Sequence, residues 1–301
     1  MTTLNAPDLN AAELTAANAT APGLTTANAT APATHVPGVT APDVTVDVIG
    51  GGFIALQARR HFGARPDIPY ATLVAAGVSD TSETSPECFR REELLVRRTA
   101  QRCREHGRLL VFLSSAAGGL YGREGEGRED GAPAPFSAYG RHKLAMERLV
   151  ADSGARWLTL RLSHLVGTQQ NARQLVPSLV RQIRSGEVAV HRGARRDLLD
   201  VRHFLVVLDR LLALGVHGRV VNVASGTAVP AERLVAGVEE RLGCRARRRF
   251  HDVPPETLRV STRLMCSLVP ESREFGLGPD YPDELLDRYV RGRGTSGGGD
   301  A

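Results

Sequence analysis

The stretch VTVDVIGGGFIALQARRHF at residues 44–62 decides the fold class. Its first part, 44–50, is a short apolar and β-branched run, which is typical of a buried strand. Glycines at 50–52 then lead into a helical pattern. Such a turn lets backbone N–H groups approach a pyrophosphate at the helix N-terminus. Glycine-rich turns are common, so a purely structural turn is the alternative.

Short apolar runs alternate with helical patterns along the rest of the chain. We expect strands at 71–79, 108–115, 188–191 and 219–225, a strand with its outgoing loop at 156–167, and helices at 86–107, 137–154, 171–185, 202–214 and 230–242. This alternation is typical of a parallel sheet covered by helices. It predicts an α/β fold with a Rossmann-like, doubly wound parallel sheet and a small C-terminal α/β part.

Composition divides the 301 residues into four regions. Residues 1–42 are mostly Ala, Thr, Asn and Pro, with TAANATAP at 15–22 echoed by TTANATAP at 25–32. They hold too few large apolar side chains to offset the entropy of ordering, so we expect a disordered tail. We expect a dinucleotide-binding domain at 43–167, a substrate-binding part interleaved with it at 168–291, and a flexible tail at 292–301.

The net charge of +5 does not by itself indicate a nucleic-acid partner. Aromatic residues make up only 5% of the chain and do not interleave with the basic runs, whereas single-strand binders stack bases on aromatic rings. We interpret the densest run, RARRR at 245–249, as a solvated face. A nucleic-acid-binding protein therefore rests on the pI of 9.4 alone.

No apolar run reaches the roughly 18 residues that a spanning helix needs, so we expect no membrane partner. The longest candidate, 204–216, is interrupted by Asp209 and Arg210. The N-terminus lacks the basic patch and apolar core of a secretory signal, and the four cysteines show no metal or redox spacing. We expect a cytoplasmic protein without a metal site.

Tyr139 and Lys143 lie four residues apart in SAYGRHKLAMERLV, so a helix places both on one face. A nearby ammonium stabilises a phenolate, which makes a tyrosine a usable proton donor or acceptor. An ordinary surface tyrosine is the alternative. Composition argues against it, because Lys143 is the sole lysine among 38 Lys and Arg residues. A compact ammonium reaches a phenol and a ribose hydroxyl where a guanidinium is a poor substitute.

A third catalytic group is expected at the end of a preceding strand, where a hydroxyl can hydrogen-bond a substrate oxygen. Ser114 and Ser115 close the apolar run RLLVFL. We prefer Ser115, because the chain turns outward after it. The alternative is a serine that caps its own turn.

These motifs resemble, in content and order, the extended short-chain dehydrogenases of the nucleotide-sugar epimerase/dehydratase family. They are GGGFIA at 50–55, AAG at 75–77, SS and LYG within 114–122, YGRHK at 139–143, RDLLDV at 196–201 and VNVASG at 221–226. GVS at 77–79 and the segment 167–186 look most like nucleotide-deoxysugar synthases and 4-ketoreductases. The resemblance covers about residues 44 to 245.

The resemblance implies a Ser–Tyr–Lys triad of Ser115, Tyr139 and Lys143, a nicotinamide cofactor and a nucleoside-diphosphate sugar. NADP(H) or NAD(H) would contact Gly50, Gly51, Gly52, Phe53, Ile54, Ala75, Ala76, Gly77, Tyr139 and Lys143. The sugar nucleotide would contact Ser115, Asn171, Arg196 and Asn222. Arg196 has an alternative as an ion-pair partner of Asp197 or Asp200. Relatives pair through helices matching 86–106 and 139–150, which implies a homodimer.

Two departures from the family pattern affect these assignments. Only about 20 residues separate GGGFIA from the strand at 71–79, so the strand whose terminal acid binds the adenosine ribose is missing. Arg59, Arg60 and Arg65 lie in this shortened segment and would suit a 2′-phosphate and so NADPH, or are solvated charges. The loop SSAAGGLYG is two residues longer than usual, which shifts the serine assignment by up to one position.

The loop after Ser115 separates the possible reactions. Dehydratases of the family carry an Asp–Glu pair there, whereas this chain has Ala116 and Ala117. The shortened coenzyme region favours a reductase, which exchanges its coenzyme every cycle, over an epimerase that retains NAD. We therefore predict reduction of a nucleoside-diphosphate 4-keto-6-deoxyhexose in deoxysugar biosynthesis. A nucleotide-sugar epimerase is the runner-up, and a non-catalytic dinucleotide-binding protein is the alternative of another class.

Overall fold

The computed structural model describes residues 45–63 and 70–290. The expected tails at 1–42 and 292–301, together with Arg65, lie outside the described residues. Within these ranges no helix combines the length and the apolar character needed to cross a bilayer.

The central element is a five-stranded sheet with the order β1-β2-β3-β5-β9, and every pairing in it is parallel. Its strands are β1 (Val46–Ile49), β2 (Ala71–Val74), β3 (Leu109–Ser115), β5 (Arg156–Leu162) and β9 (Arg219–Val223). All residues of β2 and β3 are buried, as expected for strands covered on both faces. The predicted Rossmann-like α/β fold is confirmed.

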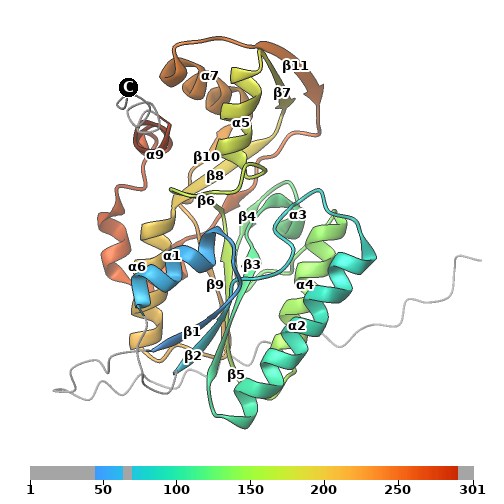
Figure 1. Cartoon of the computed structure of the whole chain (residues 1–301), viewed down its shortest axis with the longest axis vertical. Coiled ribbons are helices and arrows are strands. Elements are labelled where there is room, and N and C mark those ends of the chain that lie inside the picture. The colour runs from blue at the N-terminus through green and yellow to red at the C-terminus, as the bar shows by residue number, and fades with distance from the viewer. Residues whose placement is uncertain (1–44, 64–69, 291–301) are drawn as a thin grey trace, which may run out of the picture. The chain divides into compact units, whose positions relative to one another are not determined.

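Helices cover both faces of this sheet (Figure 1). One face carries α1 (Phe53–Phe62) and α6 (Val201–Ala213), and the other carries α2 (Pro86–Glu105) and α4 (Ala138–Ala151). Alternate residues of β3 serve the two sides. Leu109 and Val111 pack into the larger core with α1 and α6, while Leu110 and Phe112 pack against α2 and α4.

Three helices begin at a residue whose side chain accepts a backbone N–H. Ser85 accepts from Cys88 N at the start of α2, Ser137 from Gly140 N at α4, and Asp200 from Arg202 N at α6. Such caps satisfy donors that have no partner inside the helix.

Strand β1 pairs only with β2 among the described residues, so it lies at the edge of the sheet. The strand expected at 71–79 ends at Val74. Residues beyond it turn outward at the carboxyl edge of the sheet, where parallel α/β folds bind their ligands.

A smaller part lies beyond the carboxyl edge of the sheet (Figure 1). Here β7 (Glu187–Arg192) pairs with β11 (Arg247–Asp252). The helices α5 (Leu175–Arg184) and α7 (Ala231–Leu242) both pack on β7 and also contact each other. The sheet β10-β8-β6 connects it to the core through β10 (Ala228–Pro230), β8 (Arg195–Asp200) and β6 (His164–Val166). The remaining elements are α3 (Gly118–Tyr121), β4 (Glu126–Gly127), β12 (Arg259–Val260), α8 (Arg263–Leu268), the 3₁₀ helix η1 (Pro270–Phe275) and α9 (Tyr281–Tyr289).

One expectation about elements needs correction. The segment 156–167, expected as one strand and its outgoing loop, is two strands, β5 and β6, separated at Ser163. Most of the basic run at 245–249 belongs to a strand that the sequence pattern does not predict, β11, whose side chains are largely exposed, in agreement with a solvated face, and Arg249 pairs with Glu187 of β7 at 2.6 Å. Periodicity misses β11 because a two-stranded ladder at the surface needs no apolar face.

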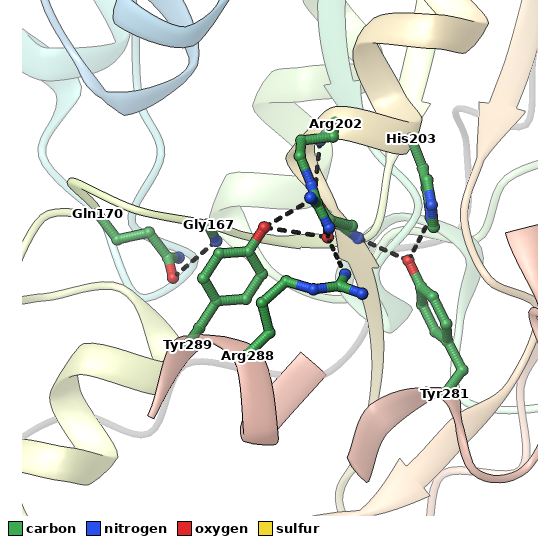
Figure 2. A network of polar contacts seen from close by, with 8 residues as sticks. Gly167, Gln170, Arg202, His203, Tyr281, Arg288 and Tyr289 are labelled. Carbon is green, nitrogen blue, oxygen red and sulfur yellow. Dashed lines mark hydrogen bonds and ion pairs between the residues drawn. The ribbon is translucent and has the colours of Figure 1, made fainter. Parts of the chain in front are cut away.

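Helix α9 is fastened to the start of α6 through Asp200, whose side chain is fully buried. The carboxylate accepts hydrogen bonds from Arg288 at 2.7 Å, from Arg202 at 2.8 Å and from the Tyr289 hydroxyl at 3.0 Å. Figure 2 shows Arg288 and Tyr289 reaching from one helix toward Arg202. Burial raises the pKa of Asp200, but the hydrogen bonds from Arg202 and Tyr289 outweigh it and hold the pKa below its usual value.

We expect Asp200→Asn to lower the free energy of unfolding at neutral pH by roughly 3–5 kcal/mol, because one partner of a buried charge network is lost. In the wild type, the pKa of Asp200 is lower in the folded chain than in the unfolded chain. The contribution of ionised Asp200 to the free energy of unfolding is therefore present above the unfolded pKa of about 4, and it is lost as the pH falls through the folded pKa. Urea unfolding across that range measures both effects.

Asp209→Asn, on the same helix outside this network, is the control and should leave the unfolding midpoint near that of the wild type. Equal pH dependence of stability in the wild type and Asp200→Asn would contradict the prediction.

Candidate active site

The glycine turn after β1 lies at the carboxyl edge of the sheet. Gly50 has φ +130°, and a Cβ there would collide with the carbonyl oxygen of Ala75. Only glycine fits this close approach. Gly51 and Gly52 are exposed and face open space. Because no side chain caps the N-terminus of α1, the amides there are open to an anionic ligand.

The turn after β2 lies directly beside the glycine turn. Ala75 N donates to Ile49 O at 2.9 Å, which continues the β1–β2 ladder into both turns. Gly77 has φ +133° and, together with Ala76, lines a cavity of about 610 Å³ along α2. The structure thus brings together the two segments, 50–54 and 75–77, that the sequence assigns to the coenzyme.

Helix α4 presents Tyr139 and Lys143 on one face, as predicted. Their exposed fractions are 7% and 4%, and the ammonium lies 5.7 Å from the centroid of the tyrosine ring. Within residues 45–63 and 70–290, no group hydrogen-bonds the Tyr139 hydroxyl. The phenol is thus available to a substrate.

Glycine next to Tyr139 sets how closely α4 approaches the preceding loop. A Cβ at Gly140 would overlap the carbonyl oxygen of Gly119 in α3. Ser137 adds a weak hydrogen bond to the same carbonyl at 3.4 Å. The start of α4 is therefore held tightly against the loop that follows β3.

The structure adds a residue that the sequence reasoning missed. Lys143 donates to Glu92 Oε1 of α2 at 2.7 Å, and both side chains are almost fully buried. A signal for Glu92 exists in the helix pattern, because it falls on the stripe formed by Val96, Ala100 and Cys103. A carboxylate on an apolar stripe requires a cation nearby.

Tyr139 lines a second cavity, of about 200 Å³. Its lining comes from the loop after β3, the start of α4, the β5–β6 junction, β8 and the segment before β12. Among its residues are Ser163, His164, Arg195 and Arg196. Segments distant in sequence therefore converge around one phenol.

The ionisable residues that line this cavity include two arginines, Arg195 and Arg196, and two carboxylates, Asp197 and Glu256. Glu256 accepts from Arg195 N at 3.0 Å and from Arg196 Nη1 at 3.2 Å. His164 lies in the same lining, where burial and the neighbouring Arg196 lower its pKa to about 4. The imidazole is therefore uncharged at neutral pH, which leaves the arginines as the cations of the cavity.

The two serines expected at the site are not among the residues that line this cavity. Ser114 donates to Glu147 at 2.5 Å, and Ser115 Oγ accepts from Ala117 N at 3.2 Å. The cavity is lined instead by Ala116 and Ala117. This is the arrangement of the alternative, a serine that caps its own turn.

A different serine belongs to the lining of this cavity, although its hydroxyl oxygen is buried. Ser163, at the junction of β5 and β6, is in its lining together with His164. Sequence reasoning missed it because the whole run 156–167 reads as one strand and its loop. The break between the two strands lies at this residue.

The two expected asparagines are not in the lining of this cavity. Asn222 is fully buried, its Nδ2 donates to Gly127 O and Ser261 O, and its Oδ1 accepts from Tyr121. Its amide holds the framework together and has no capacity left for a diphosphate. Asn171 is exposed and accepts from Arg173 N in the loop before α5.

A buried ion pair lies beneath the cavity. Both oxygens of Glu147 accept from Arg161, at 2.9 and 2.7 Å, and Arg161 also donates to the Tyr121 hydroxyl at 2.8 Å. Burial raises the pKa of Tyr121, which therefore remains a neutral hydrogen-bonding group. This network joins α4, β5 and α3.

Of the predicted polar substrate contacts, Arg196 is the one that lies in the cavity lining. It pairs with Glu256, and not with Asp197 or Asp200 as the alternative supposed. Asp197 accepts instead from the amides of Ser225 and Gly226.

The arginines of the shortened segment have separate positions. Arg59 Nη2 donates to Val48 O at 2.8 Å and to Gly50 O at 2.5 Å. Ile49 O, which lies between these two carbonyls in sequence, accepts from Ala75 N on the side of β2. Because carbonyls alternate in direction along a strand, Val48 O and Gly50 O point to the opposite, free side of β1. Arg60 is exposed.

Comparisons with known proteins find a matching family and related proteins. The sequence profile of the NAD dependent epimerase/dehydratase family matches residues 16–224. GDP-6-deoxy-D-mannose reductase of Pseudomonas aeruginosa is 28% identical over 189 residues, which are 56% of this chain and 62% of that relative. The match thus spans less than two thirds of the relative's length.

Solved structures share the fold at low identity. RMD from Pseudomonas aeruginosa complexed with NADPH has a TM-score of 0.65 at 21% identity, covering 83% of this chain and 96% of that one. UDP-glucose 4-epimerase of Thermus thermophilus, in complex with NAD, has a TM-score of 0.64 at 19% identity, covering 83% and 99%.

We expect Gly140→Ala to destabilise the protein by about 1–3 kcal/mol, because a methyl group would have to displace the backbone of Gly119. Thermal unfolding measures the effect. Gly131→Ala is the matched control, since its nearest neighbour, Arg128 O, would lie at an ordinary 3.4 Å. A melting temperature of Gly140→Ala equal to that of the control would show that α4 does not depend on this contact.

Proposed function

Because the chain belongs to the NAD dependent epimerase/dehydratase family, we propose that it reduces a nucleoside-diphosphate 4-keto-6-deoxyhexose with NADPH or NADH. The observation that carries the proposal is the Tyr139 hydroxyl. It lies in a cavity, makes no hydrogen bond within the described ranges, and is one helical turn from a buried lysine.

The glycine turn and the turn after β2 fit a dinucleotide. Gly51 and Gly52 leave open space above uncapped helix amides, which suits a pyrophosphate. The neighbouring Ala75–Gly77 turn extends that surface toward α4, where Lys143 would hold the ribose hydroxyls. When bound there, the coenzyme supplies the hydride.

The cavity around Tyr139 fits the sugar nucleotide. Arg195 and Arg196 provide positive charge for a diphosphate, and the neutral His164 provides a hydrogen-bonding group for a sugar hydroxyl. A relative named GDP-6-deoxy-D-mannose reductase supports a nucleotide deoxysugar as the substrate class.

The residues of this chain would then complete the reduction. Tyr139 donates its phenolic proton to the carbonyl oxygen as the carbonyl carbon gains the hydride, so the product is an alcohol. The ammonium of Lys143 stabilises the phenolate that remains, and a proton from solvent restores the phenol. A hydroxyl of the cavity holds the substrate oxygen in place.

The loop after β3 and the edge of the sheet favour reduction within the family. Ala116 and Ala117 line the cavity and offer no acid–base pair for the elimination of water. The edge position of β1 leaves no described strand beyond it to enclose the adenosine ribose. An open coenzyme site suits an enzyme that exchanges its coenzyme every cycle.

We expect Tyr139→Phe to lower kcat by roughly 10²–10⁴-fold, because the proton donor is lost. The dissociation constant for NADPH should remain within about twofold, since the hydroxyl is a minor coenzyme contact. The kcat is measured from the oxidation of NADPH in the presence of a nucleoside-diphosphate 4-keto-6-deoxyhexose, followed by absorbance at about 340 nm. Roughly one NADPH should be consumed for each alcohol formed.

The same assay excludes the other functions. Protein that co-purifies with NAD and interconverts sugar nucleotides without consuming reductant is an epimerase. Wild-type protein that binds coenzyme but oxidises it no faster than a protein-free control is not a catalyst.

Two serine variants test which hydroxyl holds the substrate oxygen. We expect Ser163→Ala to lower kcat/KM by roughly tenfold or more, because it removes the hydroxyl of a residue that lines the cavity. Ser115→Ala should have a smaller effect, since its oxygen accepts from Ala117 N. The reverse order of effects would return the role to Ser115.

A further inference from the structure

The strongest unexplained feature near the site is the carboxylate of Glu92. Its Oε1 accepts from Lys143 at 2.7 Å, and its side chain is 1% exposed. Glu92 lies on α2 and Lys143 on α4, so the ion pair joins the two helices that cover this face of the sheet. The sequence motifs assign Glu92 no role.

The second oxygen of Glu92 has two further partners. Oε2 accepts from Val78 N at 3.0 Å and lies 2.9 Å from His142 Nε2. The ring of His142 is stacked on Phe89 at 4.4 Å. One carboxylate thus contacts the turn after β2 through Val78 and helix α4 through His142 and Lys143.

Close packing brings the carboxylate directly against the coenzyme turn. A Cβ at Gly77 would collide with Oε1 of Glu92. Gly77 is one of the residues that would contact the coenzyme, and Glu92 lines the 610 Å³ cavity beside it. The ion pair therefore links the turn that would bind the coenzyme to the lysine that would hold its ribose.

A lysine needs such an anchor more than an arginine does. Its ammonium is a point charge on a flexible four-carbon stem, with three donors that can rotate. Glu92 engages one of these donors, and two remain for the two ribose hydroxyls. Without the carboxylate, the ammonium would be free to adopt other rotamers.

Stability alone does not account for the pair. Buried ion pairs often contribute no more than apolar residues of similar size, because desolvation offsets their attraction. The adjacent Glu93 shows the ordinary arrangement, a solvent-exposed pair with Arg97 at 2.7 Å. Glu92 instead occupies an apolar stripe one helical turn before Val96.

We propose that Glu92 is a positioning residue, which fixes the Lys143 ammonium and couples it to the Gly77–Val78 turn so that both meet the nicotinamide ribose of the coenzyme. This inference rests on the proposed function. It assigns Glu92 an effect on coenzyme binding and on turnover, with none on the affinity for the sugar nucleotide.

The test compares Glu92→Gln with Glu93→Gln, which removes a neighbouring carboxylate of the same helix that has no contact with Lys143. Dissociation constants for NADPH and NADH are measured by fluorescence titration, and kcat and both KM values by coenzyme oxidation. All measurements are made below the melting temperature of each variant.

We expect Glu92→Gln to weaken coenzyme binding and lower kcat, each by about tenfold to a hundredfold, as misplaced groups in active sites do. The KM for the sugar nucleotide should stay within about twofold of the wild-type value, because the arginine cavity is unchanged. Glu93→Gln should match the wild type in every constant.

Coenzyme affinity and kcat of folded Glu92→Gln within twofold of the wild type would overturn the proposal. An equal rise in both KM values would also overturn it, because a general loss of structure affects both ligands. If Glu92→Gln does not fold, Glu92→Asp keeps the charge and withdraws it by one methylene. It should show the same selective loss of coenzyme affinity, and wild-type affinity in Glu92→Asp would refute the role.

The proposed function and this inference fail in different ways. Wild-type protein that binds neither NADPH nor NADH refutes the proposed function. Wild-type protein that binds coenzyme, with Glu92→Gln binding it equally well, refutes only the role of Glu92.

Discussion

The parallel pairing of the five central strands is the constraint on which the site depends. Parallel strands need crossover connections. Every strand of this sheet therefore ends at the same edge, and the connecting helices lie on its two faces. The glycine turn after β1, the turn after β2 and the loop after β3 meet at this edge for that reason alone. Helix α4 packs against β3 and α2, and the close approach of Gly140 to Gly119 holds its start, with Tyr139, against the loop after β3.

Three carboxylates inside this frame carry the polar organisation. Glu92 joins α2 to Lys143, Glu147 joins α4 to Arg161 of β5, and Asp200 joins α6 to α9. Each lies where a helix meets another element, and each is matched by at least one cation. Removal from water makes such pairs intolerant of losing one member. They therefore fix the relative positions of helices that apolar packing alone would leave free to slide.

Local patterns were sufficient for the fold and for part of the site. The apolar runs, the glycine turn and the spacing of Tyr139 and Lys143 each involve neighbours in sequence, and the structure places them as the sequence indicated. The remaining groups depend on contacts across the chain. Glu92 lies 51 residues from Lys143, and Asn222 lies 101 residues from Tyr121. No periodicity reports such pairs. The serines show the same limit. Ser115 Oγ accepts from Ala117 N, whereas the next residue, Ala116, lines the cavity, and the sequence does not distinguish these two adjacent positions.

The free side of β1 has a consequence for the protein in a crowded solution. A strand edge with unpaired carbonyls can pair with a strand of another chain, and natural sheets protect such edges with charge to prevent this association. Here Arg59 covers the carbonyls of Val48 and Gly50 from the adjoining helix. A second molecule approaching edge to edge would have to displace a cation held by two hydrogen bonds and bring two such cations together. Arg59 thus places a charge on the described edge of the sheet, as natural sheets do at exposed edges.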